Sequence, residues 1–392
     1  MYTLKEVISP ADKRIFLDFP SSIYKGVKNW IRPLDKDVED VFDTKKNKLF
    51  RTGKAIRWIL EDESGKTVGR VAAFYDKKSA VKNEQPTGGL GFFECINDKE
   101  AAFMMFDACK SWLEQEGMEA MDGPVNFGDR NFFWGLLVEG DYPPTYGILY
   151  HHLYYKDFFE SYGFENYYNQ ITYQRIISDE GLSQAMKDKA ERVSKDPMYS
   201  FRTIEKNNAE KYAEYFMEVY NRAWAKFSGI SPITKVHAMA LLNGMKPFMD
   251  ERLLWFGFYG EEPVSFFLMM PDINQIICRL NGKLGLWQKL YFWYMLRIRK
   301  SIKNVIGIVF GVVPEHRVKG LEGAIVVAFS KIAMRKDFQY KTMELNWIGD
   351  FNPAMMKVAE QVGTKPYKIH VTYRYLFDRN KPFKRAPKVN VG

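Results

Sequence analysis

The pattern of apolar and polar residues divides the chain into two halves with a similar order of predicted elements. Alternating apolar positions indicate strands, and apolar positions three or four residues apart indicate helices. In the first half, elements are predicted at 2–8, from 9 onward, 56–60, 67–74, 90–96, 99–117, 158–164 and 169–177. In the second half, they are predicted at 200–204, 209–225, 235–249, 253–259, 264–270, 304–313, 320–335, 342–348, 353–362 and 367–375. This order of strand, helices, hairpin, strand, helix and closing strand predicts an α/β fold.

The closing segments of the two halves agree most closely. Gly163 stands nine residues before Thr172, and Gly363 stands nine residues before Thr372. A chain of 392 residues suits two domains, and a repeat of this length indicates duplication of a whole domain. The predicted organisation is a first domain, a polar linker, a second domain and a basic tail, at 1–178, 179–199, 200–378 and 379–392.

Charge and cysteine content narrow the class of protein. The net charge of +9 would attract a phosphate-bearing ligand, an anionic membrane or nucleic acid, and does not choose among them. The cysteines Cys95, Cys109 and Cys278 lack the spacing of a disulfide framework or a metal site. No secretory signal precedes the first strand, and no apolar stretch approaches the roughly 20 residues of a membrane span. A cytoplasmic protein without a metal is expected.

One segment between a predicted strand and a predicted helix suits an anion. Residues 312–324 read Val-Val-Pro-Glu-His-Arg-Val-Lys-Gly-Leu-Glu-Gly-Ala. Backbone N–H groups at a helix N-terminus lack partners within the helix, and with the helix dipole they attract a pyrophosphate. Gly320 would let the backbone approach the ligand closely, while Arg317 and Lys319 would add positive charge.

This segment resembles the V-x-P-x-x-[RQ]-x-x-G-x-[GA] motif of the GNAT (Gcn5-related N-acetyltransferase) family. The order of elements is similar to that family in both halves, and the run at 344–352 looks like one found in uncharacterised bacterial tandem-GNAT proteins. The resemblance implies two tandem GNAT-like domains, each a mixed, mostly antiparallel sheet flanked by helices, and an acyl-CoA co-substrate such as acetyl-CoA. The residues that it implies for CoA binding are Val312, Val313, Arg317, Val318, Lys319, Gly320, Leu321, Glu322, Gly323 and Asn352.

The sequence departs from the family at several positions. Glu322 stands where the family has Gly or Ala, and Ala359 stands where a tyrosine often protonates the departing thiolate. In the first half, Phe159 replaces the family's tyrosine, and the turn at 97–100 contains none of the motif's residues, with Lys99 as its one basic residue. The first domain is therefore expected to have a degenerate cofactor loop.

Acyl transfer to an amine needs a general base, and the candidates are two glutamates. Glu344 follows the loop on the next strand, and Glu94 lies in the first half on the equivalent of the strand that precedes the loop. His316 and the pair His151-His152 have no metal-site spacing, and no serine lies in a nucleophile elbow.

The predicted function is an acyl-CoA-dependent N-acyltransferase, of the N-acetyltransferase type, that acts on an unidentified amine. Two alternatives stay open: a Fem-like aminoacyltransferase, for which the positive charge would serve a tRNA donor, and a non-catalytic GNAT-fold binding protein. The expected partners are a CoA thioester and an amine acceptor, with no specific nucleic acid. The oligomeric state is not readable.

An aromatic segment interrupts the second half before residue 304. Residues 286–300 are apolar and aromatic and end in a basic cluster. Such a pattern is typical of a packed helix, and it also suits peripheral contact with a membrane or a wall of an acyl-chain channel.

Overall fold

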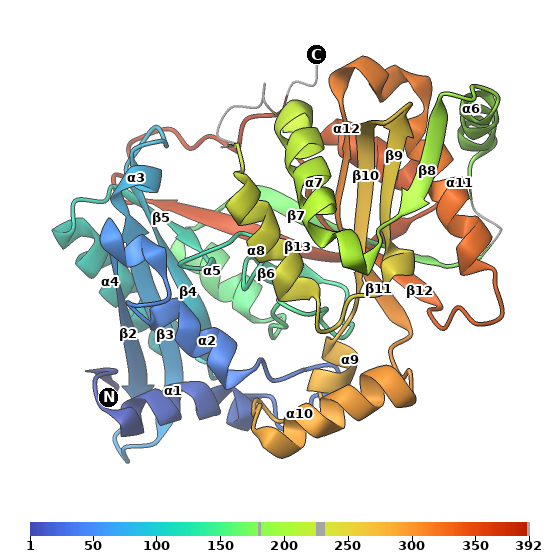
Figure 1. The fold of residues 1–392 in the computed structure, drawn as a ribbon. Coiled ribbons are helices and arrows are strands. Elements are labelled where there is room, and N and C mark those ends of the chain that lie inside the picture. Colours follow the sequence, from blue (N-terminus) through green and yellow to red (C-terminus); the bar gives the residue numbers. More distant parts are fainter. Residues whose placement is uncertain (179–181, 225–231, 390–392) are drawn as a thin grey trace. The chain divides into compact units, whose positions relative to one another are not determined.

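The computed structural model describes residues 1–178, 182–224 and 232–389, which form two compact units (Figure 1). The first unit contains Met1–Ile171, Ile276–Phe292 and Lys368–Pro387, and the second contains Thr172–Gln275, Trp293–Tyr367 and the end of the chain from Lys388. Both are α/β structures in which most strand pairs are antiparallel and helices flank the strands, as the sequence predicted. The predicted helix end at 225 and residues 179–181 and 390–392 lie outside the described residues.

The first unit has the strand order β1-β2-β3-β4-β5-β13, and β6 also pairs with β13. Its strands are β1 Thr3–Glu6, β2 Gly53–Glu61, β3 Thr67–Asp76, β4 Thr87–Cys95, β5 Ala120–Gly123 and β6 Leu136–Glu139, with most of β13 Lys365–Leu376. Its helices are α1 Pro10–Ile23, α2 Asp35–Phe42, η1 Lys48–Arg51, α3 Lys77–Ala80, α4 Lys99–Gln115 and α5 Tyr155–Tyr162. Only β4 and β5, among the pairs whose register is described, run parallel to each other in this unit.

Local chemistry explains where the helices of the first unit begin and end. Ser9 and Asp12 form a capping box at the start of α1. Asp98 accepts a hydrogen bond from the N–H of Ala101 and caps α4. Gly163 ends α5 in the left-handed conformation, with φ 106°. These capped helices pack on the strands through a core rich in aromatic rings, such as Phe93 and Phe106.

The second unit has the strand order β12-β11-β10-β9-β8. Its strands are β8 Tyr199–Thr203, β9 Leu254–Tyr259, β10 Glu262–Pro271, β11 Asn304–Val312 and β12 Thr342–Gly349. Its helices are η2 Lys206–Asn208, α7 Ala209–Trp224, α8 Lys235–Met245, η3 Glu251–Leu253, η5 Pro314–Lys319, α11 Leu321–Ala333 and α12 Pro353–Gln361. Two further helices, α9 Asn274–Ile277 and α10 Leu286–Trp293, lie where the chain passes between the units, and a π-helical turn, Tyr294–Ile298, follows α10. Here β11 and β12 are the parallel pair.

The closing strands of the two halves are exchanged between the units. Strand β7, Glu165–Ile176, closes the first half of the sequence, yet from Thr172 onward it belongs to the second unit, beside β12. Strand β13 closes the second half, yet from Lys368 onward it belongs to the first unit and pairs with β5. The compact units are therefore not consecutive stretches of sequence, and the boundaries at 178 and 200 stay a proposal.

The segment expected as a linker contains helix α6, Gln184–Ser194. Met186, Ala190 and Val193 lie one helical turn apart and are buried in the second unit. Met186 lies against Gly323 of α11. This helix is therefore part of the second unit's core.

The basic tail is bound to the first unit as far as Pro387. The guanidinium of Arg379 lies 4.6 Å from the ring centroid of Tyr375. Lys384 pairs with Glu84 at 2.7 Å, and the N–H of Ala386 donates to the carbonyl of Tyr167. These contacts hold the described part of the tail in place.

Candidate functional site

The central strand of each unit bulges near the point where its parallel neighbour stops pairing. In the first unit, the last β4–β5 pair joins Gly89 and Asp122. The register between β3 and β4 then shifts, and Phe92 takes a φ of 52°. In the second unit, the last β11–β12 pair joins Gly307 and Leu345, and a register shift against β10 follows. Bulges often lie next to active sites, and ligands of open α/β sheets bind beyond the carboxyl ends of parallel strands.

In the first unit, the space beyond this point is occupied by the protein itself. The chain after β5 turns back, and the N–H of Val125 donates to the carbonyl of Leu90 at 2.7 Å. At the end of β4, the Tyr155 hydroxyl accepts from the N–H of Cys95 at 2.9 Å, and the Tyr154 hydroxyl donates to its carbonyl at 2.8 Å. Both backbone polar groups of Cys95 thus have partners within the unit.

Beside this strand end lies Glu94, one of the two predicted bases. Its carboxylate is buried and accepts hydrogen bonds from the hydroxyls of Tyr24 at 2.7 Å and Tyr155 at 3.0 Å. Burial raises the pKa of Glu94 to about 7, although the Arg70 charge and the two hydroxyls act in the opposite direction. A carboxyl group with this pKa can exchange a proton near neutral pH.

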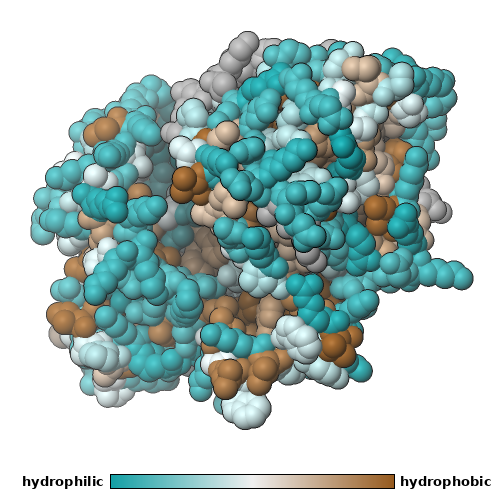
Figure 2. All heavy atoms as spheres, in the orientation of Figure 1, coloured by the Kyte–Doolittle hydropathy of each residue, from teal (hydrophilic) through white to brown (hydrophobic). Residues whose placement is uncertain are grey.

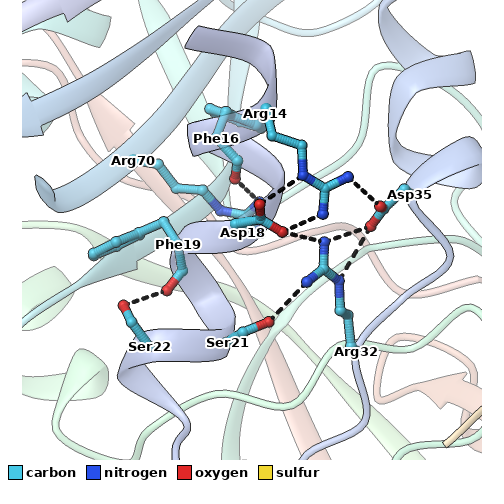
Figure 3. Close-up of polar contacts among 9 residues, drawn as sticks. All are labelled: Arg14, Phe16, Asp18, Phe19, Ser21, Ser22, Arg32, Asp35 and Arg70. Atoms are coloured by element: carbon cyan, nitrogen blue, oxygen red, sulfur yellow. Dashed lines mark hydrogen bonds and ion pairs between the residues drawn. The ribbon is translucent and has the colours of Figure 1, made fainter. Parts of the chain in front are cut away.

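Arg70 links Glu94 to helix α1. One Nη atom of Arg70 lies 3.7 Å from a Glu94 oxygen. The other donates to the carbonyl of Phe16 at 2.6 Å (Figure 3). Burial lowers the pKa of Arg70 to about 10, with the Glu94 charge opposing this shift, so the guanidinium keeps its proton at neutral pH.

A cluster of ion pairs fixes α1 against the start of α2. Arg32 donates to Asp18 and Asp35, each at 2.7 Å, and to the hydroxyl of Ser21 at 3.0 Å (Figure 3). Arg14 also binds Asp35, at 2.8 Å. Because Phe16 and Tyr24 come from α1 and its C-cap, this cluster helps to position the groups around Glu94.

Glu344, the other predicted base, lies within the paired part of β12. It is buried and accepts a hydrogen bond from the amide of Asn304 at 3.1 Å. The same amide nitrogen lies 3.3 Å from Asp272, and Thr342 donates to the amide oxygen at 2.8 Å. Asn304 thus holds two carboxylates of the second unit together.

In the second unit, the strands beyond the last parallel pair have half-buried side chains. These residues are Ile308, Val309 and Phe310 on β11 and Asn346, Trp347 and Ile348 on β12. Two helix N-termini follow the ends of the two strands, α11 after Gly320 and α12 after its N-cap Asn352. Helix N-termini favour bound anions, so this strand end suits a phosphate-bearing ligand.

The charged residues of the 312–324 segment differ in their contacts. Arg317 donates to the backbone carbonyls of Val312, at 3.2 Å, and Ala223, so its side chain is engaged within the protein. Lys319 is exposed, with its Nζ 5.7 Å from the ring centroid of Tyr259. His316 is bonded through Nδ1 to the hydroxyl of Tyr199 at 2.6 Å.

The glycines of the segment pack against α6. A Cβ atom on Gly320 would lie 2.6 Å from the Cβ of Lys189, and one on Gly323 would lie 2.8 Å from the carbonyl oxygen of Met186. Gly320 also has a φ of 92°. These glycines therefore let two helices approach closely, whether or not a ligand is bound.

Glu322 lies in the first turn of α11, and its carboxylate accepts a hydrogen bond from its own backbone N–H. Burial raises the pKa of Glu322, and the N–H bond and the charges of Lys189 and Arg317 oppose that shift. A carboxylate thus takes the position of an anion at this helix start.

The predicted loop residues lie together in one segment, and their roles are unequal. Val312, Val313 and Leu321 are buried in the core of the second unit, and the side chain of Val318 lies outside the described part of the structure. Glu94 belongs to the other unit. The residues that contact the two glutamates were not predicted, because they come from other elements and belong to no sequence motif. They are Tyr24, Arg70, Tyr155 and Asn304.

The described residues contain neither a candidate metal cluster nor a candidate membrane-spanning helix. Among the described residues, no group of three or more His, Cys, Asp or Glu side chains could hold a metal ion. No helix in the same residues has the length and apolarity to cross a bilayer.

Comparison with known proteins gives two relatives of nearly full length. The chain is 25% identical over 380 residues to "Protein YghO" of Escherichia coli (strain K12), covering 94% of each chain. It is 27% identical over 376 residues to "Bacterial ceramide synthase" of Caulobacter vibrioides, covering 94% of this chain and 95% of the relative. No family model matches the chain.

Among solved structures, the chain resembles a tandem GNAT protein from the clavulanic acid biosynthesis pathway. The TM-score is 0.54 at 10% identity, and the match covers 98% of this chain and all of the other. At this level of identity the likeness shows the fold.

Proposed function

We propose that this chain, which has the fold of the tandem GNAT proteins, transfers an acyl group from a CoA thioester to an amine. The amine nitrogen attacks the thioester carbonyl, an amide bond forms, the C–S bond breaks, and the CoA thiolate leaves and takes up a proton. A base must remove a proton from the amine. Glu344 and Glu94 are the proposed bases.

The observation that carries this proposal is the difference between the two strand ends. In the first unit, the backbone groups of Leu90 and Cys95 on β4 are hydrogen-bonded within the unit. Their partners are Val125, Tyr154 and Tyr155. In the second unit, the matching strands have half-buried side chains and are followed by the N-termini of α11 and α12. We therefore assign the CoA diphosphate to the second unit, with Lys319 as its exposed positive charge.

The relative named a ceramide synthase supports a more specific acceptor. Ceramide is the amide of a fatty acid and a long-chain amino alcohol. We propose that the acceptor here is likewise an amine on a long-chain lipid. To test this, the protein is mixed with a long-chain amino alcohol and either acetyl-CoA or palmitoyl-CoA, and the release of free CoA thiol is measured. The donor that gives the faster release shows whether the acyl group is short or long.

The first prediction concerns Glu322, whose carboxylate lies where the diphosphate would bind. Glu322→Gln removes a negative charge from the helix N-terminus at nearly constant shape. CoA should then bind about threefold to tenfold more tightly, a change of roughly 0.7–1.4 kcal/mol. Thermal denaturation with and without CoA measures this, because a ligand that binds the native state raises its stability by mass action.

Glu315→Gln is the matched control, because Glu315 lies on the same loop but is exposed and pairs with Arg222. It should leave the CoA-dependent shift nearly unchanged. If millimolar CoA or acyl-CoA stabilises neither the wild-type protein nor Glu322→Gln, the donor assignment is wrong. The Fem-like and non-catalytic alternatives would then be favoured.

A further inference from the structure

Helix α10 and the π-helical turn after it carry an exposed apolar face. Five large apolar side chains on it are each between 45% and 79% exposed: Leu286, Trp287, Leu290, Trp293 and Tyr294. Their spacing of one, three or four residues places them on one side of a helix. Figure 2 shows hydrophobic and near-neutral residues where α10 lies in Figure 1. Large apolar side chains gathered on a surface in this way mark an interaction site.

The π-helical turn at the end of this segment has contacts within the second unit. Leu296 is buried, and Arg297 donates to the carbonyl of Pro247 at 3.0 Å. Leu296, Arg297 and Lys300 also line a pocket of about 330 Å³ together with residues from 248–252 and 339–340. The part of the exposed face at Trp293 and Tyr294 is therefore followed by residues with defined contacts in the second unit.

The charged residues of this segment all have the same sign. Between 283 and 303 the sequence has no Asp or Glu. Its Lys and Arg residues stand at 283, 289, 297, 299, 300 and 303. Tryptophan and tyrosine favour the boundary between lipid headgroups and acyl chains, and basic residues beside them bind anionic lipids.

We propose that α10 and its π-helical turn dock the protein on an anionic lipid surface, with Trp287 and Trp293 inserted among the headgroups. The helix would lie in the plane of the membrane. A second copy of the chain is a poorer occupant, because a symmetric contact would bring like positive charges together. This inference goes beyond acyl transfer and does not depend on it.

Sedimentation with vesicles tests the proposal. The full chain is mixed with vesicles of phosphatidylcholine alone or of equal parts phosphatidylcholine and phosphatidylglycerol. We expect binding to the anionic vesicles that weakens with added salt. The double variant Trp287→Ser and Trp293→Ser should bind about tenfold more weakly or worse, because the apolar anchors are lost. Val236→Ser is the matched control, since Val236 is as exposed as Trp287, at 79%, but lies on α8.

A second variant pair tests the charge separately. Lys289→Gln with Arg299→Gln should weaken binding to anionic vesicles by roughly fivefold for each charge removed. Thermal denaturation of every variant shows that it is folded. The proposal is overturned if the wild-type protein does not bind anionic vesicles, or if Val236→Ser loses as much binding as the tryptophan variant. It is also overturned if the wild-type protein is a dimer that the tryptophan variant dissociates.

Discussion

Glu94→Gln is expected to remove a pH-dependent loss of stability of about 3 kcal/mol between pH 4.5 and pH 7. The ordinary pKa of the carboxyl group is 4.5, and burial raises it to about 7 in the folded protein. Within this window the folded state holds a proton that the unfolded state releases. The stability associated with the raised pKa is therefore fully present below pH 4.5 and is lost as pH rises through about 7.

The measurement is urea unfolding of the wild-type protein and the variant across this pH range. The difference between their unfolding free energies should change with pH by the stated amount, because glutamine does not titrate. Glu114→Gln, on the exposed side of α4, should run parallel to the wild type. If the unfolding free energy of Glu94→Gln also ran parallel to that of the wild type across this pH range, Glu94 would be ionised at pH 5 and its pKa would not be raised.

Gly320→Ala is expected to destabilise the protein by about 2–5 kcal/mol. The left-handed backbone at φ 92° costs a residue with a Cβ roughly 1–2 kcal/mol. The contact with the Cβ of Lys189, at 2.6 Å, would add an overpacking cost of roughly 1–3 kcal/mol unless α6 shifts.

Gly117→Ala separates these two costs. Gly117 has a similar φ of 82°, and a Cβ there would meet nothing within 4 Å. Urea unfolding should show the smaller loss for Gly117→Ala, and the excess for Gly320→Ala measures the packing of α6 on α11. Equal losses in the two variants would show that the glycine serves the backbone conformation alone.

The sequence predicted the order of elements because the apolar periodicity and the glycine after α5 are local signals. It did not predict that β7 and β13 lie in exchanged units. Both strands follow a helix and a glycine and have similar local patterns, and the exchange depends on which strand edge each one meets. Strand β5, at Ala120–Gly123, was missed because four residues are too few for a recognisable alternation.

Helix α6 carried a signal that charge obscured. Met186, Ala190 and Val193 have helical spacing, but the Lys, Asp and Glu residues between them favoured the interpretation as a linker. The predicted site also lacked the residues that contact Glu94. A continuous motif identified 312–324 as one segment, whereas the hydroxyls on Glu94 come from the C-cap of α1 and from α5. Such contacts depend on tertiary packing, which no spacing in the sequence encodes.

Binding of CoA to the second unit can be tested by titration calorimetry with one pair of variants. Lys319 and Lys99 are both exposed. Lys319 lies just before α11, and Lys99 lies at the start of α4, where it pairs with Asp157. Lys319→Glu should weaken CoA binding about tenfold, the scale of a charge-assisted contact with phosphate. Lys99→Glu should leave the affinity unchanged. A larger loss for Lys99→Glu than for Lys319→Glu would place the CoA on the first unit instead.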